Sequence, residues 1–210
     1  MNSLKGSLLI AAPSLADPNF CRTVVLIVEH TDDGAFGVVL NRPGSIKVSE
    51  LLASISEKSC ECDSRAFVGG PVQRSSVLVL HGFDDLSERS HEVISGVYLG
   101  SELALLEDIL SRSLSGELGA SSSVELPTGS GGPPGLGGEN GERFRLFCGY
   151  AGWGAGQLDR EMTAGGWLTV PAKLRHVFDI PTEKLWSEAL SCVGGPYKFF
   201  AMMPPDPEQN

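Results

Sequence analysis

The hydrophobic and polar positions of this chain follow two periods in turn, which predicts strands and helices mixed along its length. Residues 23–28 are β-branched and almost continuously apolar, so they predict a strand that is buried on both faces. Asp32-Asp33-Gly34 is typical of a hairpin turn, and residues 35–40 then resume as the antiparallel partner strand. Residues 182–192 have helical spacing instead, with apolar side chains three and four positions apart.

The same patterns place the other elements. Further strands are predicted at residues 7–12, 66–68, 76–81, 92–99, 144–148 and 167–170, and further helices at 48–55, 101–110, 157–163 and 171–177. Ser49 is the N-cap candidate of the first of these helices, and Pro171 is expected to begin the last. Leu103, Leu106 and Leu110 are expected to lie on one buried stripe. This mixture predicts an α/β (α+β-like) fold in which a mixed, partly antiparallel sheet is flanked by helices in three layers.

Glycine-rich segments interrupt the pattern twice. Gly69-Gly70-Pro71 predicts a turn with a positive φ at one glycine. The segment at about 115–141 is rich in glycine and proline and poor in core residues, so it predicts a flexible surface insertion. Neither flank looks able to form a core alone, and 210 residues suit one domain. The prediction is therefore a single domain over residues 1–210.

The net charge of the chain disfavours two classes of binding partner, nucleic acids and anionic membranes. The net charge is −10 and the isoelectric point is near 4.8, and the basic residues are scattered. Such a chain repels nucleic-acid phosphates and anionic lipid surfaces, so direct contact with either is not expected. No stretch is long and apolar enough for a membrane helix. Five cysteines are too few for a disulfide scaffold, and their odd number favours a reducing compartment.

The first candidate site is the glycine-rich stretch 149–156 and the helix start after it. A strand, a glycine turn and a helix start would present free backbone N–H groups that can hold an anion. Its candidate ligand-binding residues are Gly152, Trp153, Gly154, Gln157 and Glu161. The alternative, which we favour, is tight packing by the glycines, with Trp153 buried in the core.

The second candidate site is polar and lies near the predicted hairpin. Antiparallel pairing of 23–28 with 35–40 would place Arg22 beside Asn41 and Arg42, with Asp17 close by. An arginine there can hold a carboxylate or a phosphate. The favoured alternative for Asn41 is that its side chain fixes a turn.

Catalytic and metal motifs are weak. Neither GxSxG nor SxxK occurs, and Cys60-x-Cys62 has the wrong spacing for a zinc knuckle. His91-Glu92 begins like HExxH, but Ser95 stands where the second histidine belongs. We therefore expect no catalytic residue, metal site or cofactor.

Several segments together resemble the YqgE/AlgH family, and they span nearly the whole chain. They are residues 6–20, Arg22-Thr23-Val24-Val25, residues 37–43, Gly69-Gly70-Pro71-Val72, Gly96-Val97-Tyr98, residues 149–158, Glu161, Trp167 and Trp186. The resemblance implies a cytoplasmic bacterial protein with a mixed sheet and flanking helices. It implies little chemistry, although some members carry a transcriptional-regulator label.

Three functional hypotheses follow. The leading one is a soluble binding or regulatory protein that acts through an unknown protein partner or a small anionic ligand. The second is an enzyme, a hydrolase or transferase, that acts on an anionic metabolite through the glycine turn and Arg22 and Arg42. The third is transcriptional control, for which the charge disfavours direct DNA contact. The oligomeric state is left open.

Overall fold

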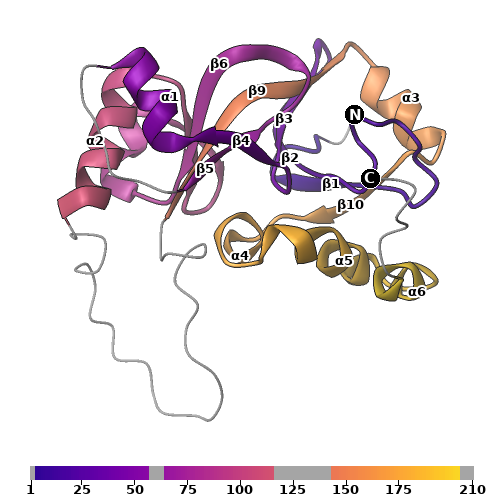
Figure 1. The fold of residues 1–210 in the computed structure, drawn as a ribbon. Coiled ribbons are helices and arrows are strands. Elements are labelled where there is room, and N and C mark those ends of the chain that lie inside the picture. Colours follow the sequence, from indigo (N-terminus) through magenta and orange to yellow (C-terminus); the bar gives the residue numbers. More distant parts are fainter. Residues whose placement is uncertain (1–2, 57–63, 116–142, 204–210) are drawn as a thin grey trace, which may run out of the picture.

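The computed structural model describes residues 3–56, 64–115 and 143–203, and within them ten strands form one curled sheet (Figure 1). The strands are β1 (Ser7–Ala11), β2 (Val24–Thr31), β3 (Gly34–Val39), β4 (Pro43–Lys47), β5 (Arg65–Val68), β6 (Val72–His81), β7 (His91–Ile94), β8 (Val97–Gly100), β9 (Phe144–Gly154) and β10 (Trp167–Pro171). The helices are α1 (Val48–Ile55), the 3-10 helix η1 (Asp84–Arg89), α2 (Leu103–Ser115), α3 (Gln157–Thr163), α4 (Leu174–Phe178), α5 (Thr182–Val193) and α6 (Tyr197–Met202).

The longest strand, β9, joins the parts of the sheet. It pairs antiparallel with β3 and β6 and parallel with β5, while the remaining pairs among these ten strands are antiparallel. The main path runs β10-β1-β2-β3-β9-β6-β8-β7, and β4 and β5 lie off it. The predicted mixed, partly antiparallel sheet with flanking helices is therefore confirmed, and all but one of its strand pairs are antiparallel.

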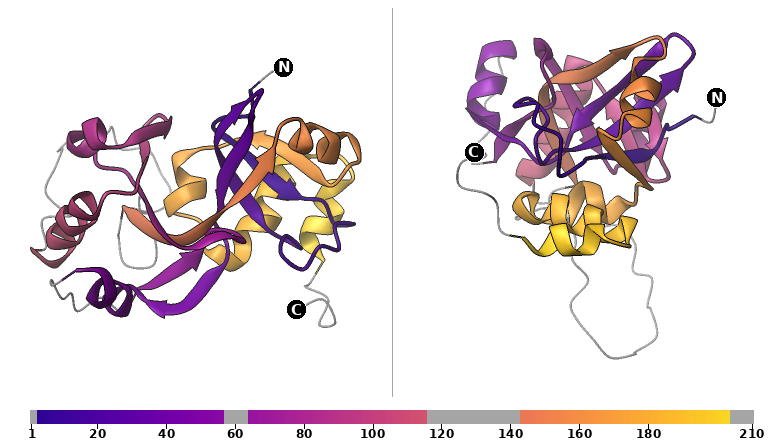
Figure 2. Two further views of the ribbon diagram at one scale, coloured as in Figure 1. Left: turned by 90° about the horizontal axis from the view of Figure 1, so that it is seen from above. Right: turned by 90° about the vertical axis from the view of Figure 1, so that its right-hand side faces the viewer.

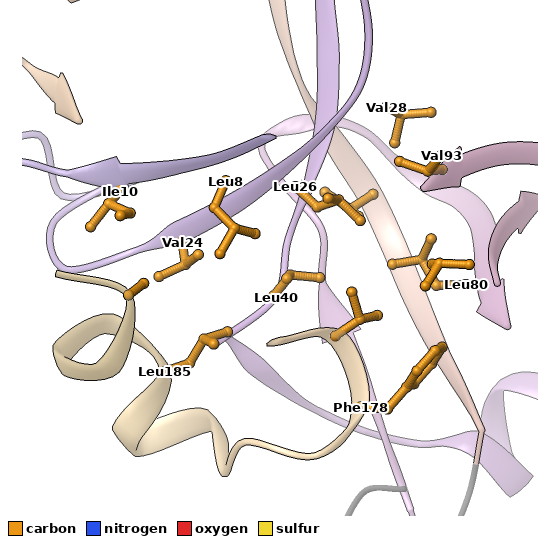
Figure 3. Close-up of a cluster of buried hydrophobic side chains, with 14 of the residues drawn as sticks. Leu8, Ile10, Val24, Leu26, Val28, Leu40, Leu80, Val93, Phe178 and Leu185 are labelled. Carbon is orange, nitrogen blue, oxygen red and sulfur yellow. The ribbon is translucent and has the colours of Figure 1, made fainter. Parts of the chain in front are cut away.

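Alternating side chains of the sheet pack on both of its faces. Leu8 and Ile10 of β1 face a cluster that includes Phe178 of α4 and Leu185 of α5 (Figure 3). Leu9 and its neighbours face the other side, where α3 packs. Helices α1 and α2 cover a third cluster around β6 and β9. The right-hand view of Figure 2 shows α4, α5 and α6 together on one side of the sheet.

The predicted hairpin is confirmed, because β2 and β3 pair antiparallel with Thr31 opposite Gly34. The predicted positive φ in the Gly69-Gly70-Pro71 turn falls on Gly70, at +156°. A Cβ there would lie 2.2 Å from the backbone of Tyr150, so the turn needs glycine for space as well as for conformation.

Several predicted boundaries are wrong for identifiable reasons. Lys47, not Ser49, is the N-cap of α1, and the side chain of Glu50 accepts its N–H. Pro171 ends β10 and pairs with Ser7, so helix α4 begins at Leu174 instead.

Two further corrections concern the middle of the chain. The single strand expected over residues 92–99 is a hairpin, β7 and β8, because Gly96 has a φ of +75° and reverses the chain. Leu103 is exposed, and Leu105, Leu106, Ile109 and Leu110 form the buried stripe of α2. Strand β4 and helices η1 and α6 were not predicted from the sequence.

The predicted Gly/Pro-rich insertion lies beyond the described residues. Its range of about 115–141 falls almost entirely in residues 116–142, outside them, so the single-domain prediction stays a prediction. Among the described helices, none combines the length and the apolar character needed to cross a bilayer.

Candidate functional site

The four residues of the second candidate site lie where the β1–β2 loop meets the end of β3. Asn41 joins the two segments: its Oδ1 accepts the N–H of Val24 at 2.8 Å, and its Nδ2 donates to the carbonyl of Arg22 at 2.9 Å. The expected proximity of Arg22 to Asn41 is therefore confirmed. Asn41 also fixes the backbone with its own side chain, which is the alternative favoured from the sequence.

Arg42 and Asp17 both form hydrogen bonds with the backbone of the same loop. Arg42 Nη2 donates to the carbonyl of Pro18 at 3.0 Å and, more weakly, to that of Cys21 at 3.4 Å. Burial lowers the pKa of Arg42, while the charges of Cys21 and Asp17 act in the opposite direction. Asp17 Oδ1 accepts the N–H of Asn19 at 2.7 Å. The Nη2 group of Arg42 is thus used on the loop backbone rather than presented to a ligand.

Arg22 is the exception in this group. Its backbone has a φ of +53°, a conformation that costs a residue with a Cβ about 1–2 kcal/mol. Its guanidinium carbon lies 4.1 Å from the ring centroid of Trp186. Within residues 3–56, 64–115 and 143–203, this guanidinium has no hydrogen-bond acceptor and no carboxylate partner. Arg22 is therefore a half-buried cation whose N–H donors remain available.

Trp186 gives Arg22 a fixed surface on which to stack. The indole is 4% exposed, and its Nε1 donates to the carbonyl of Ala11 at 2.9 Å. Trp186 lies on the apolar stripe of α5, which the sequence showed, but its contact with Arg22 joins distant segments of the chain. Sequence reasoning had no signal for that contact.

The first candidate site is not the turn that was expected. Strand β9 continues through the glycines to Gly154, and in the sheet Gly152 lies opposite Phe36 and Gly154 opposite Gly34. The glycine turn with free N–H groups is therefore a wrong prediction. The glycines instead allow β9 to lie between its neighbours: at Gly149, a Cβ would lie 2.7 Å from the carbonyl oxygen of Val72.

The remaining residues of this group form a closed hydrogen-bonded network around Glu161. Its Oε2 accepts Nε1 of Trp153 at 3.0 Å and Nε1 of Trp167 at 2.9 Å, and its Oε1 accepts Nε2 of Gln157 at 2.9 Å. Gln157 Oε1 in turn accepts the N–H of Gly154 at 3.1 Å. Desolvation raises the pKa of Glu161, but the bonds from Trp167, Gln157 and Trp153 outweigh it and the net pKa is lowered. The Glu161 carboxylate therefore stays ionised, and both of its oxygens accept hydrogen bonds from neighbouring side chains.

Phe20 links the two groups. Its ring lies 6.1 Å from the ring of Trp153 and 5.4 Å from that of Trp167, centroid to centroid. Both indoles are almost fully buried, which supports the packing role for Trp153. Phe20 and Arg42 therefore both hold the loop between β1 and β2, and Arg22 is the charged group that this loop leaves available.

A histidine and a serine outside the predicted sites also meet. His81 is fully buried, its Nε2 lies 2.8 Å from Ser90 Oγ, and its Nδ1 accepts the N–H of Phe83 at 3.3 Å. Because Nδ1 is an acceptor, the proton of the neutral ring is on Nε2 and is donated to Ser90. Burial lowers the pKa of His81 to about 4. With its Nε2 proton directed at Ser90 and its pKa lowered, His81 is a poor base for this serine, so the pair gives no support for an activated nucleophile.

Metal ligation finds no support in the part of the chain that the structure describes. No group of three or more His, Cys, Asp or Glu side chains is arranged there to hold a metal ion. Cys60 and Cys62 lie outside that part.

The fold places the chain in a class of proteins with a curled mixed sheet and helices on both of its faces. In this chain, the loop between β1 and β2 presents a stacked arginine. The chain belongs to the AlgH-like family, whose model matches residues 8–122 and 135–198. Residues 123–134, between the two matched ranges, lie within the Gly/Pro-rich segment.

The sequences of individual relatives align with this chain over nearly its whole length. A UPF0301 protein of Thermobifida fusca is 38% identical over 209 residues, covering 99% of this chain and 96% of the relative. The UPF0301 protein CT0663 of Chlorobaculum tepidum is 35% identical over 205 residues, covering 98% and 95%.

Solved structures show the same fold. The solution structure of the AlgH protein from Pseudomonas aeruginosa is similar with a TM-score of 0.67 and 30% identity, covering 98% of this chain and 96% of that one. Protein DIP2367 from Corynebacterium diphtheriae, at 23% identity, shares the fold with the same TM-score, over 94% of this chain and 91% of that one. The resemblance seen in the sequence is thereby confirmed.

Proposed function

We propose that this chain is a cytoplasmic binding protein with a regulatory role, which holds an anionic group of a small ligand or of a protein partner at Arg22. The observation that carries this proposal is the state of Arg22. Its guanidinium is stacked on a buried tryptophan and has no carboxylate partner among the described residues.

The geometry favours binding because it lowers the cost of ordering the side chain. Stacking on Trp186 restricts a long side chain that would otherwise lose rotamer freedom when a ligand arrives. A guanidinium offers paired N–H donors that match a carboxylate or a phosphate. The positive φ of Arg22 is an unfavourable backbone state, and such states are concentrated at functional sites.

Charge and cysteine state support the remaining parts of the proposal. With a net charge of −10, regulation through a protein or a small molecule is favoured over direct DNA contact. Among the described cysteines, Cys148 and Cys192 carry thiols, which suits a reducing compartment.

A thermal-shift panel tests the proposal. The probes are dicarboxylates, phosphate monoesters, nucleotides and peptides with a free carboxyl terminus. A ligand that binds the native state raises the melting temperature. We expect at least one class to stabilise the wild-type chain and to lose this effect in Arg22→Ala.

Arg74→Ala is the matched control, because Arg74 is exposed and has no side-chain hydrogen bond or ion pair among the described residues. It should keep the full shift. A panel without any stabilising probe, or shifts of equal size in Arg22→Ala, would overturn the proposal. Chemical conversion of a stabilising probe would instead favour the enzyme hypothesis.

A further inference from the structure

The C-terminal helix α6 presents an apolar surface that is unusual for so small an element. Phe199 is 73% exposed, Phe200 39%, Met202 82% and Met203 55%. These four residues form the α6 surface. The inward side of the helix is made by Tyr197 and Ala201, which pack against the main hydrophobic cluster.

The α6 surface is the largest grouping of exposed large apolar side chains among the described residues. Others lie singly on separate elements, such as Ile46 in β4, Leu103 in α2 and Leu174 in α4. Scattered exposed apolar residues need no explanation, but contiguous ones mark interaction surfaces. Helix α6 lies at the opposite end of the molecule from α1 and α2, where a partner can approach (Figure 1).

We infer that the α6 surface is a self-association surface, on which a second copy of this chain docks through the same four residues. This inference goes beyond the proposed function and does not depend on Arg22. A large apolar side chain carries on the order of 200 Å², so the α6 surface exposes roughly 500 Å². Two copies would then bury about 1,000 Å² in total, which is at the threshold of a biological interface and corresponds to weak association.

Electrostatics shape this association in a testable way. Lys198 is the only charged residue of α6, so no carboxylate opposes another within the helix. The two chains repel each other overall, because each carries a net charge of −10. Added salt screens that repulsion and leaves apolar contact intact, so the dimer should be more stable at high ionic strength. An interface held by ion pairs would show the opposite dependence.

Sedimentation velocity on the full chain tests the inference, with loading from about 1 to 200 µM, the range of weak association. The average mass should rise from that of the 22.2 kDa monomer toward twice that value. The rise should occur at lower protein concentration in about 0.5 M salt than in about 0.05 M salt. Arg22→Ala should associate like the wild-type chain, which separates this result from the proposed function.

The variant Phe199→Ser/Met202→Ser removes the two most exposed side chains, and it should weaken association at least about tenfold. Leu103→Ser/Leu174→Ser is the matched control, since it removes exposed apolar groups of two other helices. A wild-type chain that stays monomeric at every concentration would overturn the inference, and so would equal association in the α6 variant. If the monomer bound neutral-lipid vesicles through α6 instead, the occupant would be a lipid surface and the inference would be wrong.

Discussion

The guanidinium carbon of Arg22 lies 4.1 Å from the ring centroid of Trp186, and the Trp186 indole is itself fixed by a hydrogen bond to Ala11. This stacking joins the β1–β2 loop to α5. It occurs at a residue whose backbone has a positive φ, so the strain and the cation coincide at one position. Each property of Arg22 can be removed separately, which makes the relationship testable.

At position 22, glycine should give a more stable protein than alanine, although alanine is the more stabilising of the two at most positions. Both remove the guanidinium, but only glycine relieves the left-handed backbone, so Arg22→Gly should be more stable than Arg22→Ala by about 1 kcal/mol. Urea unfolding measures the difference. Position 74 is the control: it lies in strand β6 without a positive φ, so Arg74→Gly should be less stable than Arg74→Ala. The same order at both positions would contradict the strain at Arg22.

Exchanging an acid and an amide in the Glu161 network should restore stability that the single change removes. In one orientation of the new amide of Glu161→Gln, its NH₂ group faces the NH₂ group of Gln157. In the other orientation, the NH₂ group faces the two indole N–H groups, which then lack an acceptor. Either mismatch should cost about 1–2 kcal/mol. The double variant Glu161→Gln/Gln157→Glu matches every donor with an acceptor again. Chemical unfolding of the four members of this cycle should show recovery of most of the loss. Additive losses would mean that the network is not coupled as described.

Acid should destabilise the chain partly through His81. Burial lowers its pKa to about 4 in the folded state, against about 6.5 when unfolded, so the unfolded state binds more protons between these values. Stability is therefore full above about pH 6.5 and falls as the pH drops toward about 4, by up to about 1.4 kcal/mol per pH unit for one proton. His176, whose pKa burial also lowers, acts in the same direction.

The pH dependence can be assigned with two variants. His81→Phe should flatten the fall in stability between about pH 6.5 and 4 without abolishing it. Tyr98→Phe keeps the ring that stacks on His81, 5.5 Å away between centroids, and should keep the full slope. Unfolding free energies at several pH values give both slopes, and an unchanged slope in His81→Phe would refute the assignment.

Gly70 should tolerate no side chain. A Cβ would lie 2.2 Å from the Tyr150 backbone at a φ of +156°, so Gly70→Ala should cost about 2–4 kcal/mol. Gly165 has a φ of +79° with open space around it, so Gly165→Ala should show only the conformational part, about 1 kcal/mol. Thermal or urea unfolding compares the two. Similar losses at both sites would mean that the turn moves to make room.

The sequence was most informative where local pattern and tertiary structure agree. The apolar run of β2 and the turn before β3 were enough to predict the hairpin, and the hairpin alone placed Arg22 beside Asn41. The contact of Arg22 with Trp186 could not be foreseen, because it depends on how α5 packs against the sheet.

The glycine-rich stretch misled for a physical reason. Glycine is the usual signal of a turn, but in β9 it provides room for a neighbouring backbone and lets the strand continue. Helix α6 was missed because its six residues, YKFFAM, are apolar on nearly every side, so the segment lacks the alternation of an apolar and a polar face that marks a helix in a sequence.

Isothermal titration calorimetry with the most stabilising anionic probe is the most direct measurement of the role of Arg22. If Arg22 holds the anion through paired donors, Arg22→Ala should weaken binding by roughly 10- to 100-fold, and Arg22→Lys should recover only part of it. Arg74→Ala should bind like the wild-type chain. Equal affinities for wild type, Arg22→Ala and Arg22→Lys would show that the anion is held elsewhere and would contradict the proposed function.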